Sequence, residues 1–364
     1  MIRQLSNLNF SDNGQPVFII AEVGKNFIQT KDDRPPAEYL QNAKELIHAA
    51  KAAGADAVKF QTHTTEDEQL NFAITSPHFD GSDRYSWVKR NTKATPVSFW
   101  QEIKRYCAAE DIIFFSTPMS RGAAMLLNQI DVPLWKVASG DILDFVLLDY
   151  IAATDKPIII SSGMSTPAEL DFAIAFLKKR TDNLFIMHCV SKYPCPADEL
   201  YLETIPHLAK RYGLTVGFSD HSLGHEAAVA AVQKGARIIE KHFTLNRSLW
   251  GSDHKVSLTP VEFRRMVDAI RSDVVVDPVQ FGRGVKALDE RESAFRPVFR
   301  KSLVAGQDIA AGTVITKEML YAMRPQPYAG GLPSEEYENV LGKKAAKDLK
   351  KYEPITKEAI YPVK

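Results

Sequence analysis

Short apolar runs alternate with longer amphipathic stretches along most of the chain. The runs are rich in Ile, Val and Phe and nearly continuous in hydrophobicity, which is typical of parallel strands buried on both faces. Eight such runs follow one another, at residues 17–24, 57–62, 112–117, 134–139, 157–163, 184–190, 214–221 and 237–244. Apolar residues at helical spacing predict helices at 37–53, 97–109, 120–129, 141–153, 166–179, 198–211, 224–234 and 259–271, with the weakest pattern at 141–153.

Strand–helix units repeated in this way predict an α/β fold, the (β/α)8 TIM barrel, which takes about 250 residues. Thr-Pro pairs at 166–167 and 259–260 support two of the helix starts, because a capping side chain precedes a first-turn proline there. A doubly wound open sheet is the alternative, but no G-x-G-x-x-G motif follows the first predicted strand. We therefore assign residues 1–271 to a TIM-barrel catalytic domain.

The pattern changes after the barrel. Residues 272–297 lack a clear period and contain prolines and glycines, which predicts a linker. Residues 298–364 predict a small β-rich domain whose halves look alike, in SLVAGQDIAAGTVITKEML and GKKAAKDLKKYEPITKEAI. A unit of about 65 residues has a marginal core, so we expect it to pack against something larger.

An insert at residues 63–95 is long for a loop between a barrel strand and its helix. Long loops at the C-terminal face of a barrel usually close over substrate. We expect the insert to form part of such a cover, and a passive surface excursion is the alternative.

Composition excludes several classes of protein. The 364 residues contain 45 Lys and Arg against 45 Asp and Glu, whereas a general nucleic-acid binder would show a basic excess. No apolar run approaches the length of a membrane span, and MIRQLSNLNF shows no apolar leader. The three cysteines, Cys107, Cys189 and Cys195, suit neither a disulfide framework nor a zinc site. We expect a cytoplasmic protein that binds neither nucleic acid nor membrane.

The predicted strand ends are more polar than a barrel rim needs for stability. Functional groups of TIM barrels lie at these ends. The polar residues there, in chain order, are Glu22, Lys59, Gln61, Ser116, Thr117, Lys136, Ser139, Asp141, Ser161, Ser162, His188, Ser191, Lys192, Tyr193, Ser219, Asp220, His221, Glu240, Lys241 and His242.

Three chemical hypotheses follow. Lys59 and Lys136, with the neighbouring hydroxyls, suit an anionic, phosphorylated ligand, and the alternative is that each lysine pairs with a carboxylate. His221 and His242 end adjacent strands and could share one divalent metal ion, the alternative being structural histidines. Glu22 lies inside an apolar run, so it is either paired with a lysine or works as an acid or base.

The chain resembles the sialic acid synthase family, including N-acetylneuraminate, legionaminic acid and pseudaminic acid synthases. The matching strings lie at nearly every predicted strand end: AEVGKN (21–26), KFQT (59–62), STP (116–118), KVASGD (136–141), SSGMST (161–166), HCVSKYP (188–194), GFSDHSLG (217–224) and EKHFTLNRSLWGSDH (240–254). The last two are specific. RKSLVAGQDIAAGTVITKEML (300–320) resembles the antifreeze-like SAF domain of that family, so the resemblance covers essentially the whole chain.

The resemblance implies roles for individual residues. His221 and His242 match the ligands of Mn²⁺, for which Mg²⁺ or Co²⁺ are alternatives, and Glu22 matches the catalytic carboxylate. Arg324 resembles an arginine that a partner subunit's tail inserts over the sugar. Residues that match positions around phosphoenolpyruvate are Lys59, Thr117, Lys136, Ser139, Ser162, Ser191, Ser219 and His221. Residues at sugar-facing positions are Gln61, Asp141, Tyr193 and Asp253.

Several positions depart from the family pattern. Phe27 replaces the histidine of N-H-x-G, Asp141 replaces a glutamate, Ser162 stands in an S-S-G-M string, and Gln326 replaces the glycine of R-P-G. A lost histidine and a shorter carboxylate predict a less polar sugar pocket than the family norm. On that ground we favour a 6-deoxy diacetamido sugar over N-acetylmannosamine as acceptor.

The resemblance implies a reaction and an assembly. Phosphoenolpyruvate and an N-acetylated amino sugar would condense to a nine-carbon 2-keto-3-deoxy acid with release of phosphate, in a homodimer with exchanged tails. Another TIM-barrel lyase or isomerase that acts on a phosphorylated substrate is the main alternative. A carbohydrate- or ice-binding module is suggested by the tail alone, but it leaves Glu22, His221 and His242 unexplained.

Overall fold

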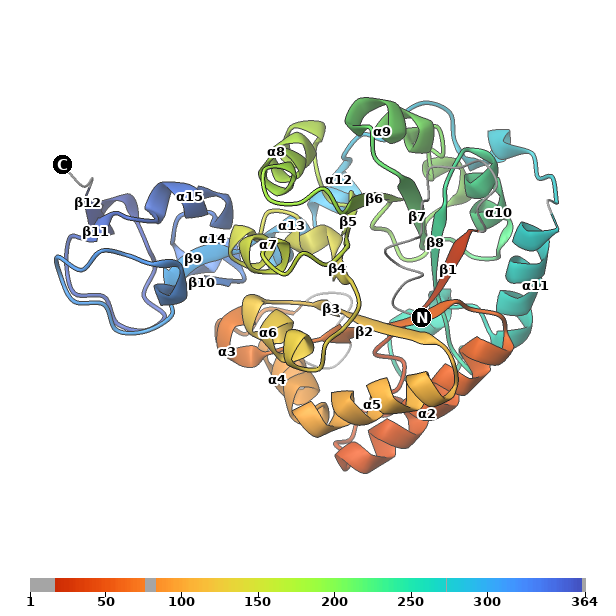
Figure 1. Cartoon of the computed structure of the whole chain (residues 1–364), viewed down its shortest axis with the longest axis horizontal. Coiled ribbons are helices and arrows are strands. Elements are labelled where there is room, and N and C mark those ends of the chain that lie inside the picture. The colour runs from red at the N-terminus through yellow and green to blue at the C-terminus, as the bar shows by residue number, and fades with distance from the viewer. Residues whose placement is uncertain (1–16, 76–82, 273, 362–364) are drawn as a thin grey trace.

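A computed structural model describes residues 17–75, 83–272 and 274–361. The segment 1–16, where the sequence shows no apolar leader, lies outside these residues, as do 76–82 of the insert. Among the described helices, none has the length and apolar character needed to cross a membrane. Figure 1 shows one large body that contains the predicted barrel, with the small C-terminal domain beside it.

The eight predicted strands are all present. They are β1 Phe18–Gly24, β2 Ala57–Thr62, β3 Ile113–Pro118, β4 Trp135–Val137, β5 Ile158–Ser161, β6 Leu184–Cys189, β7 Val216–Asp220 and β8 Ile238–His242. They form one parallel sheet in the order β3-β2-β1-β8-β7-β6-β5-β4, and β3 lies next to β4, so the sheet curls into a barrel. The prediction of a TIM barrel is confirmed.

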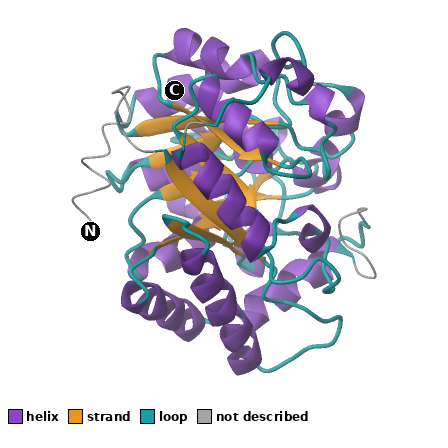
Figure 2. Cartoon of the chain, turned by 90° about the vertical axis from the view of Figure 1, so that its right-hand side faces the viewer, coloured by secondary structure: helices purple, strands orange, loops and turns teal. Residues whose placement is uncertain are grey.

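Helices surround the strands on the outside, as Figure 2 shows. They are α2 Pro36–Ala52, α5 Val97–Ala109, α6 Arg121–Gln129, α7 Phe145–Ala152, α8 Pro167–Lys178, α9 Thr204–Tyr212, α10 Glu226–Gln233 and α11 Pro260–Arg271. Each overlaps a predicted helix. Thr166 and Thr259 cap α8 and α11 through capping boxes with Glu169 and Glu262, which explains why the helices start there.

The insert contains two helices, α3 Thr65–Glu68 and α4 Arg84–Ala94. Asp83 caps α4 by accepting a hydrogen bond from the Ser86 backbone N–H at 2.9 Å. Few apolar residues mark α4, which is why the sequence pattern predicts only a long loop. Side chains of α4 line the barrel mouth, so the insert forms part of the pocket wall.

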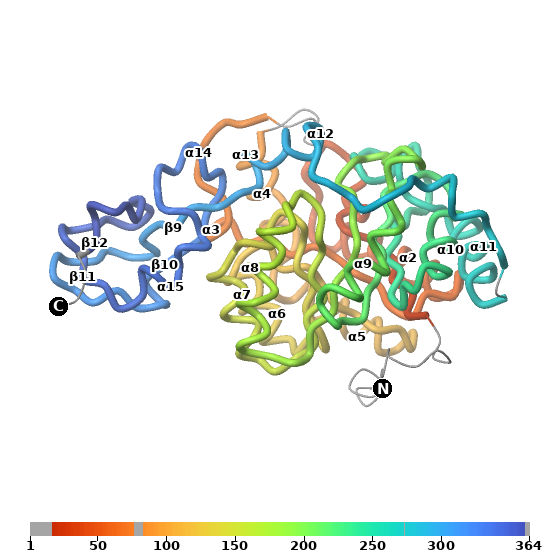
Figure 3. The backbone as a smooth tube through the Cα atoms, turned by 90° about the horizontal axis from the view of Figure 1, so that it is seen from above, coloured from red at the N-terminus to blue at the C-terminus, as the bar shows by residue number. Residues whose placement is uncertain are grey.

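The segment between the domains is more than a linker. It contains η4 Pro278–Phe281, α12 Glu290–Ser293 and α13 Arg296–Phe299, and Figure 3 shows it running along the barrel from α11 toward the tail. Glu292 is buried, and Arg296 pairs with Glu169 of α8. Glu292 and Arg296 therefore tie this segment to the barrel, and its short helices escape a sequence search for helical periodicity.

The C-terminal domain is built from two similar halves. In the first, β9 Ser302–Ala305 pairs antiparallel with β10 Leu320–Met323; in the second, β11 Lys344–Ala345 pairs antiparallel with β12 Ile360–Tyr361. The short helices are η5 Lys317–Met319, α14 Gln326–Ala329, η6 Ser334–Glu336, α15 Tyr337–Val340 and η7 Lys357–Ala359. Bridges such as Ile309 to Leu349 join the halves, and the predicted internal similarity is confirmed.

Candidate active site

The inward-facing side chains of the barrel change from apolar to polar toward the carboxyl ends of the strands. Alternate residues of a strand share a face, so a residue two positions further along points into the same interior. On β1, Ile20 lies in the apolar interior and Glu22 follows it into the pocket. The same step leads from Ala57 to Lys59, Phe115 to Thr117, Leu134 to Lys136, Ile159 to Ser161, Met187 to Cys189 and Ile238 to Glu240.

These polar ends line one pocket at the mouth of the barrel. It gathers most of the predicted site residues: Glu22, Lys59, Gln61, Thr117, Lys136, Ser139, Asp141, Ser191, Tyr193, Ser219, His221, His242, Asp253 and Arg324. Ser162 is not among the lining residues. Its neighbour Ser161 lines the pocket instead, because Ser161 stands two positions after Ile159 on β5 and therefore points into the barrel as Ile159 does. Ser161 is therefore a further candidate for substrate contact, and the role of Ser162 stays a prediction.

Glu240 also lines the pocket, although the sequence analysis assigns it no role. It stands two positions before His242 on β8 and therefore faces the same way. Lys241, between them, faces outward and pairs with Asp220 at 2.7 Å, both side chains being fully buried. The alternation of Glu240, Lys241 and His242 along the strand could have shown from the sequence that Glu240 and His242 face the pocket and that Lys241 faces outward.

Two buried lysines and two buried carboxylates form the floor of the pocket. Lys59 Nζ lies 2.7 Å from Glu22 and 3.7 Å from Glu240, and Lys136 Nζ lies 3.9 Å from Glu240. Lys136 also donates to Ser161 Oγ at 2.5 Å. Both lysines therefore have carboxylate partners, as the hypothesis of pairing predicts. They also line the open pocket, as the hypothesis of an anionic ligand requires.

The two carboxylates differ in acidity. Burial, together with the nearby charge of Glu240, raises the pKa of Glu22 to about 7, although Lys59 opposes the change. Glu240 is equally buried, but Lys136 and Lys59 outweigh burial and lower its pKa to about 2. A pair whose pKa values are pushed apart is typical of catalytic acid–base groups. Glu22 is the member suited to exchange a proton near neutral pH.

Several hydroxyl groups lie close together at the turn after β5. The Gly163 backbone N–H donates to Ser139 Oγ at 3.1 Å. A β-carbon on Gly163 would lie 2.3 Å from Ser191 Oγ and 2.5 Å from Ser139 Oγ. Glycine is therefore required for the close approach of these two serines.

Gly163→Ala tests the importance of this cluster. We expect the methyl group to push Ser139 and Ser191 apart and to raise KM for an anionic substrate by about tenfold or more, as for a lost charge-assisted hydrogen bond. Steady-state kinetics would measure it. Gly213→Ala is the control for general destabilisation, because its φ of +64° strains an alanine at the end of α9 while its β-carbon position has no neighbour within 4 Å. An unchanged KM in Gly163→Ala would show that the two serines do not contact substrate.

Glu292 of the connecting segment fixes the loops beside this cluster. Its Oε1 accepts hydrogen bonds from the backbone N–H groups of Ser191 at 2.8 Å and Met164 at 3.2 Å. Lys286 pairs with the same oxygen at 2.9 Å. A single buried carboxylate thus ties together the loops that follow β5 and β6, which positions their hydroxyls.

The two histidines predicted to share a metal ion lie together. The ring centroids of His221 and His242 are 5.5 Å apart. His221 Nδ1 lies 2.9 Å from the Val190 carbonyl oxygen, which only accepts, so Nδ1 carries the proton and Nε2 has a free lone pair. Among the described residues, His242 Nδ1 is buried without a hydrogen-bond partner. Burial lowers the pKa of His242 to about 4, which keeps this imidazole neutral.

Arg324 comes from the tail, yet it lines the pocket of its own barrel. It is fully buried and pairs with Asp141. Its backbone joins the insert, because its N–H donates to the Glu68 carbonyl and its carbonyl accepts from Leu70, both at 2.9 Å. The expected placement of Arg324 in a partner's pocket thus differs from the single chain, whose own tail already reaches this position.

The sugar side of the pocket is more charged than the sequence predicts. Phe27 does not line it, because its ring packs in the core against Phe60 and Phe99 with centroids 6.0 and 5.3 Å away. Lys25 and Arg84 line the pocket instead. Phe27 therefore adds no apolar surface to the pocket, whereas Lys25 and Arg84 add positive charge to its wall. Neither cation carries a periodic signal, since each lies at a loop or helix start.

Comparison with known proteins agrees with this geometry. The NeuB family matches residues 46–276, and the SAF domain matches residues 300–360. A pseudaminic acid synthase of Campylobacter jejuni is 36% identical over 354 residues, which are 95% of this chain and 96% of the relative. The N-acetylneuraminate-9-phosphate synthase of Homo sapiens is 32% identical over 95% of this chain and 93% of its own.

A solved structure shares the whole architecture. The spore coat polysaccharide biosynthesis protein of Bacillus subtilis superposes with a TM-score of 0.75 at 30% identity, over 97% of both chains. Similarity therefore extends through barrel and tail together. On the extent of the sequence matches and on the shared architecture, the chain belongs to the NeuB family and carries a C-terminal SAF domain.

Proposed function

We propose that the protein condenses phosphoenolpyruvate with an N-acetylated amino sugar, giving a nine-carbon 2-keto-3-deoxy acid and phosphate. The observation that carries the proposal is the joint presence, in one pocket, of Lys59 and Lys136 beside Glu22 and of the pair His221 and His242. Relatives over nearly the whole chain are pseudaminic acid and N-acetylneuraminate-9-phosphate synthases, which supports the same reaction.

Phosphoenolpyruvate binding is assigned to the lysines and the hydroxyl cluster. Lys59 and Lys136 supply positive charge for its carboxylate and phosphate, and Thr117 lies 3.1 Å from Lys59 Nζ. Hydroxyl donors orient individual oxygens of such an anion. The remaining hydroxyls assigned to this half are Ser139, Ser161, Ser191 and Ser219.

The residues present suit a divalent metal ion of the Mn²⁺ type. His221 and His242 are two imidazoles on adjacent strands, and the Val190 carbonyl orients the ring of His221 as an outer partner of a metal ligand commonly does. Among the described residues no group of three or more His, Cys, Asp or Glu is arranged to hold a metal, so further positions fall to water and substrate. A bound ion of this kind polarises a carbonyl group as a Lewis acid.

The reaction balances without a redox partner. C3 of phosphoenolpyruvate forms a bond to the aldehyde carbon of the open-chain sugar, and the aldehyde oxygen takes up a proton to become a hydroxyl group. Water adds to C2, the bond from C2 to the phosphate oxygen breaks, and the oxygen from water, having lost both protons, becomes the keto group. One proton lost by the water is assigned to Glu22, whose Oε1 accepts from Gln61 at 2.9 Å and whose Oε2 faces Lys59. Its raised pKa suits a base that works near pH 7.

The test is phosphate release from phosphoenolpyruvate against a panel of amino sugars, with and without Mn²⁺. Release that requires both an N-acetylated sugar and a divalent ion is expected. Activity on a phosphorylated substrate without phosphoenolpyruvate would favour the lyase or isomerase alternative. Sugar binding without any turnover would favour a binding module.

We place the protein in the cytoplasm as a homodimer. Phosphoenolpyruvate is an intracellular metabolite, and the three cysteines are free thiols. In the single chain Arg324 closes the pocket of its own barrel. In a dimer with exchanged tails, each contact of Arg324 with Asp141 and Glu68 forms between chains, because exchange of an identical element leaves the contacts unchanged.

Mixing two inactive variants tests the exchange. His242→Ala and Arg324→Ala are refolded together, so that one site of an exchanged mixed dimer carries both lesions and the other carries none. With random pairing, about a quarter of wild-type activity is expected to return. If each tail covers its own barrel, every site keeps one lesion and no activity returns, which would reject the exchange. Mixed dimers are verified by differential tags.

A further inference from the structure

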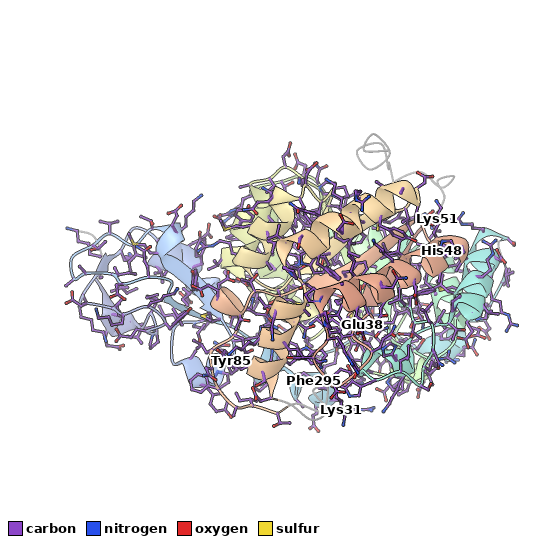
Figure 4. All side chains as sticks on the ribbon, turned by 90° about the horizontal axis from the view of Figure 1, so that it is seen from below. Lys31, Glu38, His48, Lys51, Tyr85 and Phe295 are labelled. Carbon is purple, nitrogen blue, oxygen red and sulfur yellow. The ribbon has the colours of Figure 1, made fainter. Side chains whose placement is uncertain are left out.

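Three cations line the side of the pocket formed by the insert, the loop after β1 and the tail. They are Lys25, Arg84 and Arg324, and their residues are only 8%, 3% and 0% exposed. Figure 4 labels Lys31 of the loop after β1, Tyr85 of the insert and Phe295 of the segment between the domains. The proposed chemistry with phosphoenolpyruvate uses none of the three cations as acid, base or metal ligand.

The carboxylates in this region compensate two of the three cations. Glu68 lies 3.1 Å from Arg84 and accepts a hydrogen bond from His63 Nδ1 at 2.6 Å. Asp141 pairs with Arg324 and lies 3.0 Å from Lys301, which also pairs with Asp144 at 2.6 Å. Arg84 and Arg324 therefore each have a carboxylate partner.

Lys25 is the cation left with the weakest compensation. The hydrogen-bond partner of its Nζ is His63 Nε2, a ring nitrogen. Within the described residues no carboxylate lies within 4.0 Å of that ammonium group. Burial lowers the pKa of Lys25 to about 7, and it lowers the pKa of His63 to about 4, so His63 supplies a neutral partner.

The two guanidinium groups converge although they repel each other. The Phe299 ring lies 4.7 Å from the Arg84 guanidinium carbon and 5.6 Å from that of Arg324. Burial and the charge of Arg324 lower the pKa of Arg84 to about 9. In the part of the chain that the structure describes, Arg324 Nε is buried without a hydrogen-bond acceptor. Like charges that lie close together in a buried, low-dielectric region raise the free energy of the protein unless an anion binds between them.

Lys25, Arg84 and Arg324 line the same pocket as the two histidines. Asp253 lines the pocket and is an electrostatic neighbour of both Lys25 and His242. An acceptor whose aldehyde lies near His221 and His242 would extend its other end toward Lys25. Guanidinium groups bind phosphate and carboxylate through two parallel hydrogen bonds, and an ammonium group adds a point charge.

We infer that the acceptor sugar carries an anionic group, a phosphate monoester or a carboxylate, at the end away from its aldehyde, and that Lys25, Arg84 and Arg324 bind it. The inference rests on the proposed condensation and narrows its acceptor from a neutral amino sugar to an anionic one. It replaces the preference for a 6-deoxy acceptor, which depended on a less polar pocket.

The test compares kcat/KM for N-acetylmannosamine, its 6-phosphate and its 6-carboxylate, with phosphoenolpyruvate saturating. At least one anionic sugar is expected to exceed the neutral one by about tenfold or more, in line with a charged hydrogen bond. The two anionic arms distinguish phosphate from carboxylate. If no N-acetylated amino sugar of any charge releases phosphate, the proposed function itself fails; if the neutral sugar matches or exceeds both anionic ones, only the inference of an anionic acceptor fails.

The variant Lys25→Met tests whether the preference for an anionic sugar depends on this group of cations. The substitution keeps the length of the side chain and removes its charge, and we expect the ratio of anionic to neutral kcat/KM to fall about tenfold. Lys51→Met is the matched control, because Lys51 lies on the outer helix α2 (Figure 4) and its ratio should stay at the wild-type value. An unchanged ratio in Lys25→Met would overturn the assignment of Lys25.

A binding measurement separates recognition from turnover. The alditols made by reducing the aldehyde of each sugar cannot condense, so calorimetry reports their affinity alone. Wild-type protein should bind the alditol 6-phosphate or 6-carboxylate more tightly than the neutral alditol, and Lys25→Met should lose that difference while still binding phosphoenolpyruvate, which reports intact folding. Equal affinities of wild-type protein for all three alditols would overturn the inference.

Discussion

His242→Ala should lower kcat/KM by about a thousandfold or more, and His221→Ala should do the same. In the proposed metal site, the loss of one of the two imidazole ligands removes several kcal/mol of stabilisation of charge at the aldehyde, and each 1.36 kcal/mol is a factor of ten. Steady-state phosphate release with excess Mn²⁺ measures the effect. Chelation should silence the wild type, and Mn²⁺ should restore it.

His48→Ala provides the control for this prediction. His48 lies on the outer helix α2 beside Glu110 at 3.1 Å, and Figure 4 shows it far from the pocket edge marked by Phe295. The variant should keep its activity. Full wild-type activity in excess chelator would contradict the metal role of the histidine pair, provided that metal analysis after gel filtration shows no ion left in the protein.

Glu22→Gln should lower kcat by about 10²–10⁴-fold, the usual contribution of a positioned base. The amide keeps the shape of the side chain and its contact with Gln61, so phosphoenolpyruvate should still bind. A loss confined to KM would instead mark Glu22 as a binding group. Glu38→Gln is the control, since Glu38 is exposed in the first turn of α2 (Figure 4).

The pH dependence follows from the acidity of Glu22. Because the base works deprotonated and its pKa is about 7, kcat/KM for phosphoenolpyruvate should fall as pH drops below about 7. Glu22→Gln should lack this limb. A change of kcat/KM with pH that both proteins show comes from ionisation of the substrate. The measured quantity is therefore the difference between the two pH profiles of kcat/KM. Identical profiles would contradict proton transfer by Glu22.

Most of the barrel could be predicted because its signal is periodic. Continuous apolar runs identify strands such as β5 and β6, and a Thr-Pro start identifies α8. The short helix α4 and the connecting segment could not be predicted, because their order comes from tertiary contacts. Arg84, for example, is held by Glu68 and Phe299 and not by a local apolar stripe.

The pocket residues on the strands could be predicted from the alternation of inward-facing and outward-facing side chains. The step from Ile20 to Glu22 or from Ile238 to Glu240 and His242 is readable in the sequence once the apolar interior positions are known. Ser162 was assigned against that alternation. Lys25 and Phe27 could not be distinguished in this way, because both follow the end of β1, where side-chain direction depends on the loop.

The most direct test of the proposed condensation uses phosphoenolpyruvate labelled with ¹⁸O in the oxygen that bridges C2 and phosphorus. The label is followed by mass spectrometry during turnover with the preferred amino sugar and Mn²⁺. Cleavage of the C2–O bond predicts that the released phosphate carries the ¹⁸O and that a nine-carbon 2-keto acid forms in equal amount. Label retained on the carbon product, or phosphate release that does not depend on the sugar, would contradict it.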